Sequence, residues 1–286
     1  MKRKIIGLFG LILAGLSLAS CGKNDKNIRI AASQLPHAKI LTEAVAPVLE
    51  KKGYTLTVDV LDWTIQNSQV AVGDYDANYF QHAPYLETYN SSVSDNEKLE
   101  MVCKVHFEKL CLYASDTNNK NLKNGDSIEI VNDISNIERA LLLLQNNNIL
   151  TINQSCYNEN NEFVNFNITN PLQSVTFTEN YSNCTLTCLA ESVLTTSLAD
   201  YNFGVIPGNT ALTGLGSEYA KRIVLSETIS KDVLDLRSNG IAVRKENANS
   251  DKIKALVEAF KDESVATYIN NTFGESVVYN FIDLLK

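Results

Sequence analysis

Histidine is scarce in this chain of 286 residues, which contains only His37, His82 and His106. The paired patterns HxxxH and HExxH are absent, and with them common sequence signatures of a catalytic zinc site. The Gly-x-Ser-x-Gly, phosphate-loop and Gly-x-Gly-x-x-Gly patterns of hydrolases and nucleotide-dependent enzymes are absent as well. The sequence therefore predicts a protein that is not an enzyme and that uses no cofactor and no metal.

Positive charge is also in short supply, since 25 Lys and Arg residues face 33 Asp and Glu residues and the net charge is −8. This balance disfavours a nucleic-acid partner, because the phosphate backbone would be repelled. Beyond the N-terminus, no apolar segment is long enough to span a membrane. The hydrophobic fraction is nevertheless 44%, enough for one large domain or two of ordinary size.

The N-terminus has the layout of a secretory signal. Basic residues 2–4 precede a short apolar run over residues 5–18, which ends in Leu18-Ala19-Ser20-Cys21. Small residues before a cysteine suit the lipoprotein signal peptidase, and the thiol then carries a diacylglyceryl group. We expect a signal peptide over residues 1–20, a lipid anchor at Cys21, a polar tether over residues 21–27 and a place on the extracytoplasmic face of the cell membrane. The alternative is an ordinary signal peptide or anchor helix with a chance cysteine.

Five further cysteines follow Cys21, so at least one has no partner within the chain. They are Cys103, Cys111, Cys156, Cys184 and Cys188. The Cys184-Thr-Leu-Thr-Cys188 spacing is typical of a small loop or of one helical turn. Because no histidine lies nearby in the sequence, we favour a disulfide or buried free thiols over a metal site.

Hydrophobic spacing predicts alternating strands and helices in the first part of the chain. Strands are expected over residues 27–33, 56–61 and 76–80, and helices over residues 37–52, 67–72 and 82–89. Gly53 stands where a helix C-terminal cap belongs. This β-α-β-α-β order is typical of a parallel sheet with helices on its faces.

Residues 102–115 form a long extended stretch, after which the alternation resumes. Strands are expected over residues 127–132, 149–153, 175–178, 203–207 and 240–244, and helices over residues 135–145, 189–198, 253–260 and 265–272. Ser135 and Glu138 have the spacing of a capping box. We expect two α/β lobes, with crossovers near residues 113–118 and 234–240. Lobe I would comprise residues 28–114 plus 240–286, and lobe II would comprise residues 115–239.

Three strings occur in the order found in one known family. They are Asp76-Ala-Asn-Tyr-Phe-Gln-His-Ala-Pro-Tyr-Leu86, Asn132-Asp-Ile-Ser-Asn-Ile-Glu-Arg-Ala-Leu-Leu-Leu-Leu-Gln145 and Gly204-Val-Ile-Pro-Gly-Asn-Thr-Ala211. With weaker matches around them, they span most of residues 27–260. On these strings the chain resembles the methionine-binding lipoproteins of ABC importers.

The resemblance implies a type II periplasmic-binding-protein fold, with two mostly parallel sheets, flanking helices and a ligand cleft between the lobes. It also implies capture of a free amino acid, methionine before others, and its delivery to a membrane permease driven by a cytoplasmic ATPase. The chain departs from the family where Lys109-Leu110-Cys111 replaces the usual Pro-Met-Gly, where Trp63 replaces a tyrosine, and over the divergent residues 156–188. These departures concern the ligand more than the fold.

Arg139 is the best candidate to hold the ligand carboxylate, because a guanidinium can grip it with two parallel hydrogen bonds. It lies near a predicted helix N-terminus, which also favours an anion. From the residues alone, a solvated helix arginine in an i,i+4 pair is the simpler interpretation. The resemblance favours ligand binding, and it implies the same for Asn209 and Asn239. An asparagine offers a donor and an acceptor, although Asn209 could equally be a helix N-cap.

Phe80, His82, Tyr85 and Trp63 are expected to form the side-chain pocket, since aromatic faces suit a thioether. Ordinary core packing is the alternative for the aromatic residues, and a helix-start hydrogen bond is the alternative for His82. Three further hypotheses remain open for the whole chain. The ligand could be another apolar amino acid or a methionine-containing dipeptide, the protein could bind metal through His82, His106 and Glu108, or it could be an adhesin or a binding protein that has lost its ligand.

Overall fold

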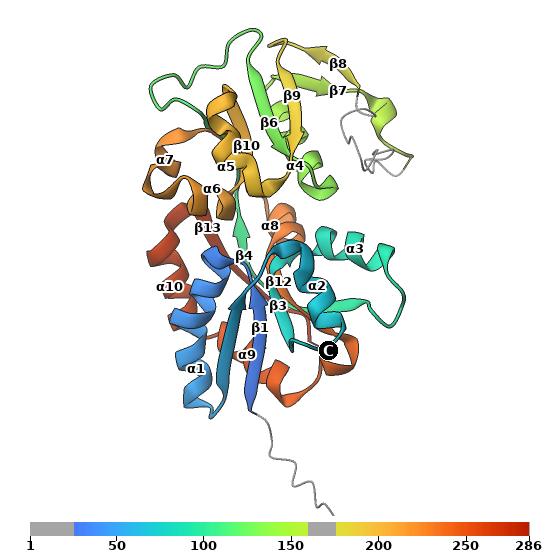
Figure 1. Cartoon of the computed structure of the whole chain (residues 1–286), viewed down its shortest axis with the longest axis vertical. Helices are drawn as coiled ribbons and strands as arrows, with labels where there is room; N and C mark the ends of the chain where they lie inside the picture. Colours follow the sequence, from blue (N-terminus) through green and yellow to red (C-terminus); the bar gives the residue numbers. More distant parts are fainter. Residues whose placement is uncertain (1–25, 160–175, 286) are drawn as a thin grey trace, which may run out of the picture.

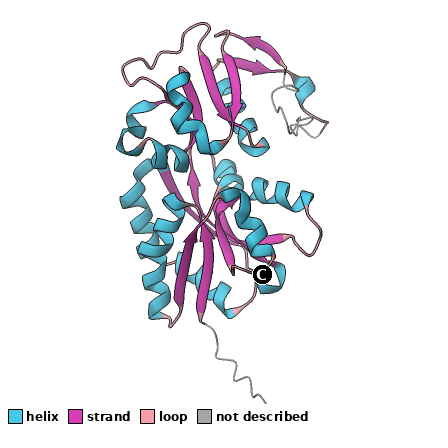
Figure 2. Ribbon diagram, in the orientation of Figure 1, coloured by secondary structure: helices cyan, strands magenta, loops and turns pink. Residues whose placement is uncertain are grey.

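The computed structural model describes residues 26–159 and 176–285, which fold into two α/β lobes (Figure 1). Each lobe is built on a mixed sheet with helices packed around it, as Figure 2 shows. The predicted signal peptide and Cys21 lie outside the described residues. Among the residues that are described, no helix combines the length and apolar character needed to cross a membrane.

Lobe I is built on the strands β1 (Asn27–Ala32), β2 (Thr55–Val60), β3 (Ala77–His82), β4 (Leu99–Glu108), β12 (Asn239–Arg244) and β13 (Val277–Asp283). They form one sheet in the order β13-β4-β12-β3-β1-β2. β1 runs parallel to β2 and β3, whereas β12 is antiparallel to its neighbours β3 and β4. The parallel part confirms the β-α-β-α-β prediction.

The helical segments that accompany this sheet are η1 (Gln34–Ala38), η2 (Leu41–Val45), α1 (Ala46–Lys51), α2 (Trp63–Ala71), α3 (Ala83–Ser92), α8 (Lys231–Arg237), η8 (Lys245–Asn247), α9 (Asp251–Phe260), α10 (Glu263–Phe273) and η9 (Gly274–Ser276). Leu35 within η1 has extended backbone angles, with φ of −125° and ψ of 142°, and the chain is helical from there to the end of α1. α1 ends before Gly53, whose φ of +77° suits glycine. α8 and β13 were not predicted from the sequence.

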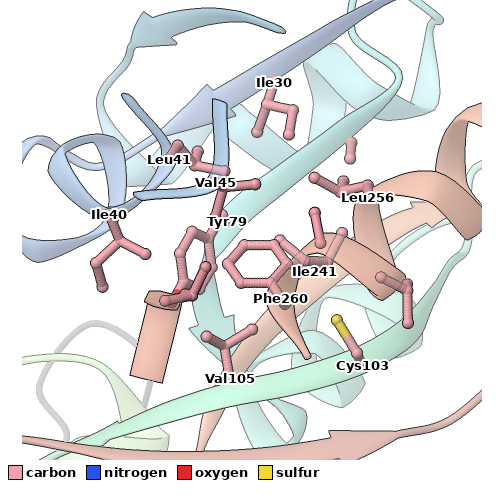
Figure 3. Close-up of a cluster of buried hydrophobic side chains, with 14 of the residues drawn as sticks. Ile30, Ile40, Leu41, Val45, Tyr79, Cys103, Val105, Ile241, Leu256 and Phe260 are labelled. Atoms are coloured by element: carbon pink, nitrogen blue, oxygen red, sulfur yellow. The ribbon is translucent and has the colours of Figure 1, made fainter. Parts of the chain in front are cut away.

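The core of lobe I lies between the sheet and the helices that cover it (Figure 3). The rings of Tyr79 on β3 and Phe260 on α9 meet at its centre, with their centroids 5.5 Å apart. Aliphatic side chains surround them, among them Ile30, Ile40, Leu41, Val45, Val105, Ile241 and Leu256. Each such side chain stabilises the fold by about 1.5–3 kcal/mol when it is fully buried. The strands β3, β4 and β12 are therefore held firmly in place.

Lobe II is built on the strands β5 (Leu110–Ala114), β6 (Ser127–Val131), β9 (Thr185–Leu189), β10 (Phe203–Pro207) and β11 (Ile223–Ser226), in the order β11-β5-β10-β6-β9. Two further strands, β7 (Leu150–Ile152) and β8 (Phe177–Asn180), form a separate antiparallel pair. The helical segments are α4 (Ile134–Asn146), η3 (Gln154–Cys156), η5 (Glu191–Val193), α5 (Leu194–Ser197), η6 (Leu198–Asp200), α6 (Gly208–Gly214), η7 (Gly216–Glu218) and α7 (Tyr219–Arg222).

The two sheets share one design. In each, the strand that follows a crossover from the other lobe is inserted antiparallel: β12 between β3 and β4, and β5 between β10 and β11. The lobes are thus joined twice, and both crossovers lie beside inserted strands. This two-lobe α/β architecture confirms the predicted fold class.

Both crossovers lie earlier in the chain than predicted. β4 ends at Glu108 and β5 begins at Leu110 in the other sheet, so the first crossover is at Lys109 rather than near residues 113–118. β11 ends at Ser226, and α8 packs against α3 and β13 of lobe I, so the chain returns over residues 227–230. The predicted lobe boundaries are therefore wrong by several residues. An apolar extended stretch carries no mark of which sheet each half will join.

Two local predictions in lobe II were also wrong. Cys184 directly precedes β9 and Cys188 lies in it, and β9 pairs with β6, so the two cysteines are spaced along a strand rather than around a loop or a helical turn. None of the five described cysteines forms a disulfide with another described residue, and four of them are buried whereas Cys188 is partly exposed. The N-cap of α4 is Asp133 rather than Ser135, because the Asp133 side chain accepts from the backbone N–H of Asn136.

A buried carboxyl group in lobe II gives a stability prediction. Glu129 lies on β6, Ser197 Oγ donates to its Oε2 at 2.5 Å, and burial raises the pKa of Glu129 to about 7. Because this pKa lies above the ordinary value of 4.5, the folded chain holds an extra proton between these values, and stability falls as pH rises through this window. We expect Glu129→Gln to raise the free energy of unfolding near neutral and alkaline pH by on the order of 2 kcal/mol. Urea unfolding measures this gain, and an equal gain below the ordinary glutamate pKa would contradict the explanation.

Candidate functional site

A cavity lies between the two lobes and encloses about 550 Å³ of space, part of it open to solvent. Its walls come from β3, α2, α3, β4 and β12 of lobe I and from α4, η5, β10 and α6 of lobe II. The lining residues are Ser33, Trp63, Phe80, Gln81, His82, Tyr85, Glu108, Asp133, Asn136, Arg139, Glu191, Pro207, Asn209, Arg237 and Asn239. All seven residues predicted to bind ligand are among them.

One wall of the cavity is aromatic. Tyr85, in the first turn of α3, lies between Trp63 and Phe80, with ring centroids 5.4 Å and 5.5 Å away and both contacts edge-to-face. His82 is the N-cap of α3, and its Nδ1 accepts from the backbone N–H of Tyr85 at 3.3 Å. Burial and the nearby Arg139 and Arg237 hold the pKa of His82 well below its usual value, so the ring is neutral. The helix-start hydrogen bond expected as the alternative for His82 is thus present, and the same ring also faces the cavity.

Arg139 lies on α4 and lines the cavity. The pair of parallel hydrogen bonds that was expected to hold the ligand carboxylate is made to Glu227 instead. Nε and Nη2 donate to the two carboxylate oxygens of Glu227, at 2.9 Å and 2.6 Å. Nη1 donates to Asn136 Oδ1 at 2.9 Å, and Nη2 also donates to the carbonyl of Glu108 at 3.1 Å. Four of the five N–H donors of the guanidinium are therefore engaged, which leaves one on Nη1 without a partner among the described residues. With only 6% of its surface exposed, Arg139 is not a solvated helix arginine.

Two asparagines approach the cavity from opposite lobes and meet at Glu108. The backbone N–H of Asn209, in the first turn of α6, donates to Glu108 Oε2 at 3.1 Å. Asn239 begins β12, and its Nδ2 donates to Glu108 Oε1 at 3.1 Å. The N-cap of α6 is Pro207, so the alternative interpretation of Asn209 as a helix cap is wrong.

Several polar cavity residues were missed from the sequence or given another role. Glu108 was considered only as a metal ligand, and Glu191, Arg237 and Asp133 were not considered at all. Burial, with nearby Asp133 and Glu108, raises the pKa of Glu191 to about 7. Asn136, Asp133 and Gln81 lie within the strings that support the family resemblance, which is the signal that could have pointed to them. Nothing in the local pattern marks Arg237 or Glu191.

The residues that could hold a metal differ from those expected. The donor atoms of His37, His106 and Glu108 lie within 4.8 Å of one another, whereas His82 is not part of this cluster. Both ring nitrogens of His106 have partners, because Tyr79 Oη bonds to Nδ1 and Glu108 Oε1 lies 2.8 Å from Nε2. Burial lowers the pKa of both histidines to about 3, so they are neutral. A metal ion would have to break the hydrogen bonds of His106, whereas neither ring nitrogen of the buried His37 has a hydrogen-bond partner among the described residues, although its Nε2 lies 3.3 Å from Glu108 Oε1.

The chain matches known proteins over nearly its whole length. The model of the family described as NlpA lipoprotein matches residues 28–281. The methionine-binding lipoprotein MetQ of Bacillus subtilis is 30% identical, over 97% of this chain and 98% of its own. The D-methionine-binding lipoprotein MetQ of Salmonella typhi is 27% identical with the same coverage.

Solved structures agree with the sequence matches. A nutrient-binding protein from Burkholderia cenocepacia, solved bound to methionine, has a TM-score of 0.76 and 25% identity, over 88% of this chain and 99% of its own. An ABC transporter periplasmic substrate-binding protein from Coxiella burnetii has a TM-score of 0.73 and 24% identity, over 88% of this chain and 100% of its own, which supports the fold. The family match spans the predicted strings and both lobes. The chain belongs to the NlpA lipoprotein family.

Proposed function

We propose that this protein captures a free amino acid, methionine before others, and delivers it to the membrane permease of an ABC importer. The observation that carries the proposal is a cavity between two lobes with an aromatic wall and a polar wall. Aromatic faces are favourable partners for a thioether, at roughly 0.3–1.5 kcal/mol per contact. The polar wall offers Arg139, Asn209 and Asn239 to the charged end of the ligand. The methionine bound to the Burkholderia cenocepacia relative supports the same assignment.

Closure of the lobes explains how such a site would select its ligand. Groups on α4 and α6 of lobe II and on β12 of lobe I line the cavity, so one small ligand touches both lobes. Only a ligand of suitable length and charge stabilises the closed form over the open form. The closed form would then be recognised by the permease, which a cytoplasmic ATPase drives. A lipid on Cys21 would keep the protein beside that permease, on the outer face of the cell membrane.

A longer ligand is the second candidate, because the cavity continues into an open groove. The groove shares Ser33, Trp63, Glu191 and Asn209 with the cavity and encloses about 1010 Å³, much of it open to solvent. A methionine-containing dipeptide could extend along it. Such a ligand would keep the thioether against the aromatic wall and place its second residue in the groove.

Thermal unfolding of the domain without residues 1–20 tests these proposals. We expect L-methionine or D-methionine to raise the melting temperature, since a ligand at 100 times its Kd stabilises the folded state by about 2.7 kcal/mol. Methionine-containing dipeptides and zinc are measured in parallel. A larger shift with a dipeptide would favour the longer ligand, and a shift with zinc alone would favour a metal-binding lipoprotein. No shift with any methionine species would exclude the leading proposal.

A further inference from the structure

We propose that Glu108 is the receptor for the ligand's amino group and the clasp that joins the two lobes around it. The inference deepens the proposed function and rests on it. Glu108 is the last residue of β4, directly before the crossover at Lys109, and it lines the cavity with 7% of its surface exposed. It therefore lies at a point where the chain passes from one lobe to the other.

The hydrogen bonds of Glu108 connect both lobes to the cavity. Oε2 accepts from the backbone N–H of Asn209 in lobe II, and Oε1 accepts from the side chain of Asn239 in lobe I. Both bonds are 3.1 Å long, and both donor residues line the cavity themselves. Opening of the cleft would separate α6 from β4 and break the bond to Asn209. The Glu108 carboxylate thus belongs to the closed form.

Among the described residues, no lysine or arginine side chain forms an ion pair with the Glu108 carboxylate, and its basic neighbours are the imidazoles of His106 and His37, whose Nε2 atoms lie 2.8 Å and 3.3 Å from Oε1. The nearest guanidinium, that of Arg139, donates to the backbone carbonyl of Glu108 and holds the carboxylate of Glu227 instead. The neighbouring imidazoles of His37 and His106 are neutral because burial lowers the pKa of each. Burial also raises the pKa of Glu108. A buried carboxylate without a cation is costly, and a ligand that brings a positive charge would relieve that cost.

The acceptors at this place suit an ammonium group. Asn239 uses its Nδ2 on Glu108, which leaves Oδ1 as the free end, and within the described residues Oδ1 accepts no hydrogen bond. An ammonium group has three N–H donors and no acceptor, so it can donate to Glu108 and to Asn239 Oδ1 together. Glu108 would then act in two ways, by contact with the amino group and by fixing the orientation of the Asn239 amide.

Calorimetric titration of Glu108→Gln with two ligands tests the amino-group contact. One ligand is L-methionine, and the other is 4-(methylthio)butanoate, which has the same side chain and carboxylate but no amino group. We expect Glu108→Gln to weaken L-methionine binding by about 10- to 100-fold, the value of a charge-assisted hydrogen bond, and to change butanoate binding little. Equal weakening of both ligands would overturn the contact, because a purely structural role affects both alike.

Glu129→Gln is the matched control, because it removes a second buried carboxylate that lies outside the cavity. It should leave both affinities unchanged. If Glu108→Gln does not fold, Glu108→Asp keeps the charge on a shorter side chain and should still prefer L-methionine to the butanoate. Loss of that preference in a folded Glu108→Asp protein would count against the contact.

Small-angle X-ray scattering without ligand tests the clasp separately. We expect Glu108→Gln to have a larger radius of gyration than the wild type and Glu129→Gln to match the wild type. Equal radii for all three proteins would overturn the clasp. If the wild type fails to bind L-methionine, the proposed function and the amino-group contact fall together, and scattering still decides the clasp. If the wild type binds and Glu108→Gln binds equally well, only the inference about Glu108 fails.

Discussion

Replacing Arg139 by alanine is expected to abolish methionine binding and to lower the free energy of unfolding by about 3–5 kcal/mol. The loss of stability follows because Glu227 is 14% exposed and would keep its charge without its partner. The Arg139–Glu227 ion pair joins three segments at the lobe junction. Arg139 lies on α4, Glu227 begins the return crossover, and Glu227 also accepts from the backbone N–H of Leu110 on β5. Calorimetric titration and urea unfolding measure the two effects.

A double variant separates the two effects of Arg139. A buried ion pair replaced by apolar residues of similar size often recovers the stability that a single substitution loses. We expect Arg139→Met with Glu227→Leu to unfold at nearly the wild-type urea concentration and still to bind no methionine. Normal methionine binding by this double variant would show that the guanidinium serves only the fold. In that case the one N–H that Glu227, Asn136 and Glu108 leave free has no ligand role.

Gly240→Ala is expected to have the second large effect, a loss of about 3 kcal/mol or more in the free energy of unfolding. A Cβ at Gly240 would overlap with the backbone carbonyl oxygen of Cys103 on the neighbouring strand β4, and Met101 Sδ would lie 3.0 Å away. Because the obstacle is backbone, β12 would have to move away from β4. That movement would displace Asn239 from Glu108, so methionine binding should weaken as well.

Gly125→Ala is the control for this variant. A Cβ at Gly125 meets nothing within 4 Å, although φ is +88°. It should therefore cost only the backbone strain of about 1–2 kcal/mol and leave methionine binding unchanged. Thermal melts with and without L-methionine measure both proteins. If Gly240→Ala bound methionine normally, the position of Asn239 would not depend on close contact between β12 and β4.

The cavity residues could be predicted because they lie in short strings of family-like sequence. Phe80, His82 and Tyr85 share one string, Arg139 lies in the second and Asn209 in the third, and all five line one cavity. What the strings could not show is how these residues use their hydrogen bonds. The partner of Arg139 is Glu227, which is 88 residues away in sequence, and no local pattern marks such a pair.

The fold was predictable where the hydrophobic period was strong and not where strands change sheets. The strands β1, β3 and β10 and the helices α4 and α9 follow from their apolar spacing. The long stretch containing Lys109 was predicted as one extended segment, but it forms two strands in different sheets. Extended backbone has the same period in either sheet. The switch is therefore decided by tertiary pairing, and this is why Glu108, one residue before it, was not recognised as a cavity residue.

A crystal structure with selenomethionine as the added ligand tests the central claim most directly. Selenium has nearly the shape of the thioether sulfur, and its anomalous signal locates the ligand without ambiguity. We expect one selenium peak against the aromatic wall of Trp63, Phe80 and Tyr85, with the amino group at Glu108 and Asn239. A peak elsewhere, or no peak at saturating ligand, would contradict the account of this cavity as a methionine site.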